Sequence, residues 1–289
     1  MNNISLYLAS VLIWGSTWLV ITFQFGIVAA EVSVFYRFAL ATFIFLCFCI
    51  VRRLPLRYTG RDHVFLALQG IFNFALNYVF IYHAEQYVSS GLVALVFSAM
   101  IPINIIGSRL FFGDQITQNV FIGAALGLAG IALVFAPEMA QLSAAKNAPL
   151  GLLLALLGAA SASAGNLFAV RNQRAGMPVI QTNTVGMFYG TLFMGLLAWG
   201  MGHKFNFDSS PNYTMSLIYL SLFGTVLAFS AYMTLMKRIG AGRASYVAVL
   251  VPIVALLLST FFEHFTWHVA TVIGVALCIA GNALILSKR

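Results

Sequence analysis

Amide, hydroxyl and aromatic side chains lie inside long apolar runs of the sequence, where they could bind a small molecule. Gln69, Asn73 and Asn77 follow one another at four-residue spacing, which places them on one face of a helix. A stripe of amides that faced lipid would leave several polar groups unsatisfied. The stripe therefore faces a wet cavity or other helices, and either substrate binding or interhelical hydrogen bonding explains it.

Aromatic rings and small polar groups in other apolar runs extend this candidate binding surface. Trp14 and Trp18 lie one helical turn apart and deeper than an interfacial aromatic belt. Their rings would face an organic substrate or pack against a neighbouring helix. Thr17, Ser161 and Ser230 are further polar groups of the same kind. The candidate substrate-binding residues are Trp14, Ser16, Trp18, Asn73, Asn77, Tyr78, Tyr82, Phe97, Met100, Ser163, Asn166, Tyr232 and Tyr246.

Two charged residues and two prolines are the other candidates for function. Arg37 and Glu85 lie near the ends of apolar runs, so we expect their side chains to extend to the membrane interface. The middle of the membrane then holds no strong acid, which favours facilitated diffusion or indirect proton coupling. Pro102 and Pro252 occupy the middle of two runs and predict a pair of hinges, because proline removes a helix hydrogen bond.

Catalytic chemistry is poorly supported by the same residues. The 7 acidic residues are dispersed, and the 5 histidines have no metal-ligand spacing on one face. The 3 cysteines lie in apolar runs without paired spacing, which indicates packing. We therefore expect no catalytic residues, no metal and no cofactor. An enzyme embedded in the membrane and acting on a lipid or isoprenoid stays as the alternative.

The composition requires a membrane as solvent. Hydrophobic residues make up 61% of the 289 residues and charged residues only 8%, against roughly a quarter in a soluble domain. Runs of about 20 apolar residues can cross a bilayer as helices. Ten such runs can be drawn, near residues 4–23, 32–51, 63–83, 89–111, 118–136, 149–170, 178–201, 214–236, 243–262 and 267–286. The first is expected to be a retained span and not a cleaved signal peptide.

The placement of Lys and Arg predicts the orientation. With ten spans and a cytoplasmic N-terminus, Lys146 and Lys204 are the basic residues of the outer connections. Twelve others fall at the inner ends, as the positive-inside rule requires. We therefore predict a multi-pass protein of the cytoplasmic (inner) membrane with both termini in the cytoplasm. Because the basic residues are scattered, nucleic acid is not expected as a partner.

The two halves of the chain resemble each other. Residues 123–134 (GAALGLAGIALV) and 274–285 (GVALCIAGNALI) agree at seven of twelve positions. Pro102 and Pro252 match at nearly the same offset. We predict two five-helix repeats, residues 1–137 and 149–289, joined by a loop over 138–148. An odd number of helices per repeat inverts the second copy, which is a common arrangement in secondary transporters.

The chain resembles the EamA-type transporters of the drug/metabolite transporter superfamily. The resemblance rests on LIWGSTW at 12–18, VSSGLVALVFSAMIPINIIGSRLFFGD at 88–114, GAALGLAGIALV at 123–134, and GAGRASYVAVLVPIVALLLSTFFEH at 240–264. It implies an all-α polytopic protein of ten transmembrane helices, with a central cavity lined by spans 1, 3, 4, 6, 8 and 9. Residues 161–166 read SASAGN where similar sequences often carry a tryptophan, so the aromatic lining differs there.

The resemblance and the residues together predict a secondary transporter. We expect a probable exporter of small organic metabolites such as amino acids, working by alternating access between the two repeats. Its partners would be the metabolite and the lipid bilayer. The G-x-x-x-G patterns at 123–127 and 186–190 favour close helix packing within one protomer, although a homodimer through spans five and ten is the alternative.

Overall fold

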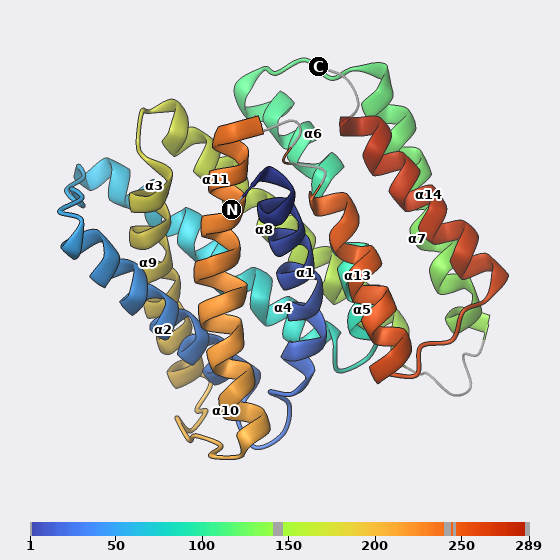
Figure 1. Ribbon diagram of the computed structural model, residues 1–289, viewed down its shortest axis with the longest axis horizontal. Helices are drawn as coiled ribbons and strands as arrows, with labels where there is room; N and C mark the ends of the chain where they lie inside the picture. The colour runs from blue at the N-terminus through green and yellow to red at the C-terminus, as the bar shows by residue number, and fades with distance from the viewer. Residues whose placement is uncertain (1, 141–146, 240–243, 245–246, 287–289) are drawn as a thin grey trace.

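The computed structural model describes residues 2–140, 147–239, 244 and 247–286, and in these ranges the chain forms helices and no strands (Figure 1). The α-helices are α1 (Asn3–Thr22), α2 (Ala30–Val51), α3 (Gly60–Ile71), α4 (Asn77–Ala84), α5 (Ser90–Phe97), α6 (Met100–Phe112), α7 (Gln118–Ala140), α8 (Ala148–Arg174), α9 (Val179–Gly200), α10 (Pro211–Ile218), α11 (Ala228–Ile239), α13 (Val247–Phe262) and α14 (Val269–Leu286). Two π-helical segments are η1 (Phe72–Leu76) and η2 (Tyr219–Leu227).

Polar residues at several helix starts fix where the elements begin. The Asn2 side chain accepts a hydrogen bond of 2.8 Å from the Ser5 backbone N–H at the start of α1. Thr59 caps α3 in the same way, and Ser210 caps α10 just before a proline at its first position. These side chains satisfy N–H groups that a helix start otherwise leaves without a partner.

Length and apolar character identify membrane-crossing stretches among the described residues. Six helical stretches qualify as spans: Asn3–Thr22, Ala30–Val51, Gly60–Ala84, Ser90–Phe112, Ala148–Arg174 and Pro211–Tyr232. Shorter apolar helices are Gln118–Val134, Val247–Phe262 and Val269–Ile285. Helix α9 is 22 residues long but carries four consecutive buried polar residues over 181–184. The all-α polytopic fold is thus confirmed, whereas the count of ten crossings stays a prediction.

The helices form a main bundle and a separate pair (Figure 1). Helices α2, α3 and α9 pack together on one side of the bundle, and α1 packs against α13 and α11. Helix α8 runs beside α3, α4 and α6. Helices α7 and α14 pack mainly on each other and lie side by side at the right edge of the view in Figure 1.

Glycines hold α7 and α14 in close contact. A Cβ atom at Gly123 would lie 2.5 Å from the carbonyl oxygen of Gly281, and one at Gly130 would lie 2.5 Å from that of Gly274. The reverse contacts, from Gly281 to Gly123 and from Gly274 to Gly130, are equally short. The packing is therefore internal, between the fifth and tenth predicted spans of one chain, as the first interpretation of the G-x-x-x-G pattern favoured.

The four glycines also match across the sequence repeat. Gly123 corresponds to Gly274 and Gly130 to Gly281 at the offset of 151 that aligns the two halves. Gly123 thus contacts Gly281, the counterpart of Gly130, and Gly130 contacts Gly274, the counterpart of Gly123. A two-fold axis that relates the two halves produces this pattern. The contact is the one expected from the predicted internal repeat, which stays a prediction.

The π-helical segments fall in corresponding helices of the two halves. Segment η1 interrupts the third predicted span, between α3 and α4, and η2 interrupts the eighth, between α10 and α11. A π-turn widens the helix and frees backbone groups, and such turns often occur at functional sites. The indole N–H of Trp14 donates to the Gly224 carbonyl of η2 at 3.2 Å, so the aromatic ring on α1 uses one of these groups.

The two prolines differ in their effect. Helices α5 and α6 are separated at 98–99, where short i to i+3 backbone hydrogen bonds replace the regular pattern just before Pro102. The break is the one that proline at this position predicts. Helix α13 instead runs through Pro252 as one element. The carbonyl that Pro252 leaves without its usual donor is that of Ala248. That the two prolines act as a pair of hinges stays a prediction.

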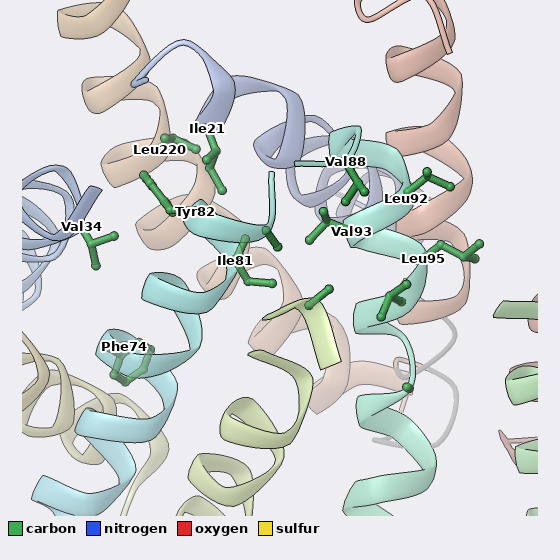
Figure 2. Close-up of a cluster of buried hydrophobic side chains, with 14 of the residues drawn as sticks. Ile21, Val34, Phe74, Ile81, Tyr82, Val88, Leu92, Val93, Leu95 and Leu220 are labelled. Carbon is green, nitrogen blue, oxygen red and sulfur yellow. The ribbon is translucent and has the colours of Figure 1, made fainter. Parts of the chain in front are cut away.

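The main hydrophobic core lies where α1, α2, η1, α4, α5 and η2 converge (Figure 2). Figure 2 shows Tyr82 and Leu220 beside Ile21, with Leu92 and Val93 on the neighbouring α5 and Val88 just before it. Ile21, Phe74 and Ile81 belong to this core and also line the central cavity. The core therefore borders that cavity.

Candidate functional site

A cavity of about 450 Å³ lies between the helices, within the range of roughly 300–1,000 Å³ that is typical of small-molecule sites. Its lining is mostly apolar, with a few polar groups. The lining residues come from α1, η1, α4, α5, α6, α8, α11 and α13, and also from α2 and α9. All six spans that the resemblance implies contribute residues to the lining, and α2 and α9 contribute as well.

The cavity gathers most of the residues that the sequence singled out. Those that line it are Trp14, Trp18, Asn73, Asn77, Tyr78, Phe97, Met100, Asn166, Tyr232, Thr17 and Pro252. Their role in binding stays a prediction. Pro102 is not among the lining residues, and Tyr246 lies outside the described residues.

Three predicted residues lie away from the cavity lining. The Ser16 hydroxyl is within 2.7 Å of the Tyr219 hydroxyl, so it joins α1 to η2. Tyr82 is fully buried and donates to the Gln24 side chain at 2.6 Å. Ser163 is buried on α8 without a hydrogen-bond partner. Helical spacing alone identified the correct helices but not which side of each helix faces the cavity.

Two of the further polar residues that the sequence singled out bond to backbone instead. The Ser161 hydroxyl donates to the Phe72 carbonyl at 3.0 Å, which ties α8 to η1. The Ser230 hydroxyl donates to the Val226 carbonyl of its own helix at 2.7 Å. Neither side chain lines the cavity.

One wall of the cavity presents amide groups. The Asn73 side chain on η1 donates to the Asn166 side chain on α8 at 3.3 Å, and the Asn166 amide lies 3.4 Å from the Met100 sulfur. Asn77 donates to the backbone carbonyl of Asn73 at 2.9 Å, one turn away. The wide turn of η1 leaves this carbonyl available. These residues hold one another in place and present polar edges to the cavity.

The third member of the amide stripe has a structural role. Gln69 is fully buried and donates to the Asn183 side chain at 2.8 Å. Its carbonyl oxygen accepts from the Asn172 side chain, also at 2.8 Å. The stripe thus divides: Gln69 joins α3 to α8 and α9, while Asn73 and Asn77 reach the cavity.

The opposite wall is aromatic. The Trp14 ring packs edge-on against Phe229 at 5.4 Å between centroids and against Tyr232 at 5.1 Å. The Trp18 ring meets Phe97 edge-on at 5.3 Å. Such pairs add stability beyond the area that they bury. Rings held in this way offer a rigid apolar surface to an organic solute.

Arg37 lines the cavity, which corrects the expectation that its side chain extends to the interface. The residue is only 2% exposed, and its Nε and Nη1 atoms have no hydrogen-bond partner. Its guanidinium lies 4.6 Å from the Tyr78 ring centroid and 5.4 Å from that of Phe38. The interfacial interpretation fails because Arg37 is on the face of α2 that packs against η2, where Ser221 donates to its backbone carbonyl.

Glu85 is buried as well, again contrary to the expectation of an interfacial side chain. It is 7% exposed, and neither carboxylate oxygen has a partner. The carboxylate interacts electrostatically with Arg37, but the two side chains form no ion pair within 4.0 Å. Glu85 follows α4 directly, and the packing of the core around that turn buries it.

A set of polar contacts joins the connections at one end of the bundle, which we call the closed end (residues 23–31, 83–90, 202–210 and 263–268). The Glu31 carboxylate contacts His83 Nε2 at 2.8 Å and His203 Nε2 at 3.3 Å. Glu263 accepts hydrogen bonds from the backbone N–H and the hydroxyl of Ser90, at 3.2 Å and 2.6 Å. None of the residues that make these contacts lines the cavity.

The cavity extends toward the other end, which we call the arginine-rich end (residues 52–62, 109–118 and 171–179). Gln173 and Val179, at the junction of α8 and α9, belong to its lining. Arg171 pairs with Asp62 at 3.0 Å at this end. The lining therefore reaches the arginine-rich end and includes no residue from the segments of the closed end.

Some lining residues had no sequence signal that singled them out. Phe229, Asn183 and Gln173 lie in apolar or mixed stretches without a distinctive spacing. Arg37 did carry a signal, because a charge well inside an apolar run is rare in membrane helices. Its distance of seven residues from the start of α2 places it about 10 Å along the helix, deeper than an interfacial position needs.

Comparison with known families identifies the protein class. The profile of the EamA-like transporter family matches residues 1–136 and 149–287. The chain belongs to the EamA-like transporter family. This membership confirms the resemblance, and it indicates a membrane transporter and not an enzyme. Together with the spans found above, it gives a polytopic membrane protein.

Relatives of this EamA-like transporter carry similarly general names. The uncharacterized inner membrane transporter YedA of Escherichia coli is 29% identical over 253 residues, covering 86% of this chain and 79% of YedA. An uncharacterized transporter of Buchnera aphidicola is 25% identical over 255 residues, covering 88% and 81% of the two chains. A solved crystal structure superposes with a TM-score of 0.65 at 17% identity, over 96% of this chain and 94% of that one. The last likeness concerns the fold.

Proposed function

We propose that this EamA-like transporter exports small organic metabolites of amino-acid size across the cytoplasmic membrane by alternating access. The observation that carries the proposal is the cavity of about 450 Å³, whose lining reaches the arginine-rich end and includes no residue from the segments of the closed end. A channel needs a continuous path lined by a filter, whereas a carrier binds its solute in a site that faces one side at a time.

The chemistry of the cavity favours organic solutes. One wall presents the rings of Trp14 and Trp18, and the other presents the amides of Asn73 and Asn166. Apolar walls with a few oriented polar groups are typical of sites for small organic molecules. Amino acids and related metabolites combine an organic side chain with polar groups and fit this surface.

The internal repeat supports the mechanism. The symmetric glycine contacts of α7 with α14 and the matched positions of η1 and η2 are what two copies of one unit in opposite orientations would give. In such a protein, the halves exchange conformations and so convert one open side into the other. The closed end would open as the arginine-rich end closes.

The predicted orientation is compatible with export, which is the direction that we propose. The arginine-rich end is cytoplasmic by the positive-inside rule. The cavity then faces the cytoplasm in this structure, with the polar contacts of Glu31 and Glu263 on the outer side. A site that takes its solute from the cytoplasm is what export requires.

Uptake of radiolabelled amino acids into proteoliposomes tests the proposal. We expect saturable, stereoselective flux of at least one amino acid into vesicles that contain the protein, and none into empty vesicles. Trp18→Ala removes a cavity ring and is expected to reduce the flux, whereas Trp199→Ala removes a ring that is 74% exposed and is expected to leave it unchanged. Flux that does not saturate, or the formation of a chemically altered lipid product, would refute the carrier mechanism.

A further inference from the structure

A buried carboxylate lies between two histidines at the closed end. Glu31, in the first turn of α2, is 2% exposed. Its Oε1 atom lies 2.8 Å from Nε2 of His83, and its Oε2 atom lies 3.3 Å from Nε2 of His203. The two histidine side chains are 36% and 33% exposed, so both rings can exchange protons with water while the carboxylate is shielded from it.

The ends of two helices hold the histidines in place. Gly202 follows α9 with a φ of 75°, a left-handed conformation that favours glycine. The chain turns there, and the backbone N–H of His203 donates to the Ala198 carbonyl at 3.0 Å. His83 lies in the last turn of α4. Both rings are therefore carried by regular helix ends.

The contact between Glu31 and His203 joins the two predicted halves of the chain. Glu31 and His83 belong to residues 1–137, whereas His203 belongs to residues 149–289. If the halves rock against each other and open the closed end, His203 moves away from Glu31. His83 belongs to the same half as Glu31 and can stay beside it.

Other polar contacts between the halves at this end, such as two described here, contain no imidazole. The Ser90 hydroxyl donates to the Glu263 carboxylate at 2.6 Å, and the Asn206 side chain donates to the Ile27 carbonyl at 3.1 Å. Among the hydrogen bonds and ion pairs of the described residues that join the halves at the closed end, the one with Glu31 contains a histidine. Histidine is the side chain that ordinarily changes its charge between about pH 5 and 8.

The charges that act on this cluster come from its own members. Glu31 interacts electrostatically with His83 and His203, and His83 interacts with Glu31. Lys204, next to His203 in the chain, forms no ion pair with any described residue. The other titratable residues of the surrounding elements interact with different groups: Tyr36, Tyr82, Glu85, Asp208 and Tyr213.

The charge on His203 determines how strongly it attracts Glu31. Its Nε2 atom is buried and makes no hydrogen bond, so the contact at 3.3 Å depends on electrostatic attraction. A neutral imidazole presents a lone pair or a single N–H to the carboxylate, whereas the protonated ring adds a full positive charge. Attraction between opposite charges is also stronger away from bulk water. Protonation of His203 therefore stabilises the closed end.

We propose that Glu31 and His203 form a pH-sensitive latch that keeps the closed end closed when the histidine is protonated. The proposal rests on the alternating access proposed above and adds a control of its outer gate. Because the ion pair exists in the closed state and is broken in the open one, linkage requires that acid favours closure and that alkali favours opening. His83 is a positioning residue, which holds the carboxylate of Glu31 toward the gate.

Distance measurements between spin labels on the full-length protein in nanodiscs test the proposal. Labels at Ile27→Cys and Met215→Cys lie on the two halves near the closed end, at positions that are 72% and 71% exposed. Cys47 is exposed and is replaced by alanine so that it takes no label. One proton bound in one state alone changes a two-state ratio by up to about tenfold per pH unit. We expect the ratio of long to short distances to rise at least about tenfold between about pH 5.5 and pH 8.

His203→Gln assigns the response to the latch. Glutamine keeps an N–H donor but takes no charge, so the ratio should change by less than about twofold over the same pH range. His268→Gln is the matched control, because His268 is an exposed histidine of the closed end that forms no ion pair with any described residue. It should respond as the wild type does. A wild type without a pH response, or a His203→Gln variant that keeps the full response, would overturn the proposal.

Two more variants separate the latch from a contact that is merely structural. His203→Lys carries a positive charge throughout this pH range, so the short distance should dominate at both ends of it. His83→Gln leaves the contact between the halves in place and should keep a response of the same sign. If His83→Gln loses the response while His203→Gln retains it, the latch is assigned to the wrong histidine and the proposal fails.

Flux measurements distinguish this proposal from the proposed function. If the closed end opens with rising pH through His203 but no solute crosses proteoliposomes, transport is refuted and the latch stands. If flux is saturable while the distances in the wild type do not depend on pH, the latch is refuted and transport stands.

Discussion

Replacement of Gly70 by alanine tests how closely α3 and α9 must approach. A Cβ atom at Gly70 would lie 1.9 Å from the carbonyl oxygen of Gly186, against a practical lower limit of 3.0 Å. The obstacle is backbone on both sides, so the helices have to move apart by about an ångström. That movement would also stretch the 2.8 Å hydrogen bond between Gln69 and Asn183. Overpacking and the weakened hydrogen bond together give an expected loss of about 2–4 kcal/mol.

The measurement is the free energy of unfolding in detergent micelles, followed by tryptophan fluorescence as denaturant is added. Gly127→Ala is the matched control, because a Cβ atom there would meet no atom within 4 Å. It lies inside α7, so alanine should leave stability unchanged or raise it by up to about 1 kcal/mol. If Gly70→Ala unfolds with the same free energy as Gly127→Ala, the contact between α3 and α9 is not as tight as described.

Two further substitutions probe polar contacts of different burial, by the same unfolding assay. Gln69→Leu should destabilise by about 1–3 kcal/mol, because the Asn172 amide nitrogen loses its acceptor and the Asn183 amide oxygen loses its donor. Adding Asn183→Leu should recover part of this loss, and a strictly additive double variant would contradict the coupling. Arg174→Ala breaks a pair with Asp114 whose side chains are 49% and 37% exposed, so the loss should stay below about 1 kcal/mol and shrink as salt is added. A loss that is larger, or that is insensitive to salt, would show that the pair is not a simple surface contact.

The sequence was most informative where a physical rule left few alternatives. Long apolar runs cannot be soluble, and the repeated glycines of 123–134 and 274–285 predicted close packing that the structure shows between α7 and α14. The amide and aromatic residues of the first, third and sixth predicted spans also reach one cavity. In each case, the residue types and their helical spacing determined whether the side chains face lipid, another helix or the cavity.

The faces and depths of individual side chains could not be predicted in the same way. Spacing placed Ser16 and Ser163 on the correct helices, but which side of a helix faces the cavity depends on the packing of its neighbours. Arg37 and Glu85 were assigned to the interface because both lie near span ends. Arg37 is buried partly by segments more than a hundred residues away in the sequence, such as the one that carries Ser221. No local sequence pattern encodes such contacts.

The pairing of α7 with α14 has a consequence for how the chain could be divided. Each helix finds its main partner in the other half of the sequence, and neither packs extensively on its own half. A gene cut within the connection at 138–148 would yield two fragments, each with one apolar helix lacking its natural counterpart. When both fragments are made in one cell, they would associate through the matching glycine surfaces of α7 and α14. A fragment made alone would contact lipid, or a second copy of itself, along that surface.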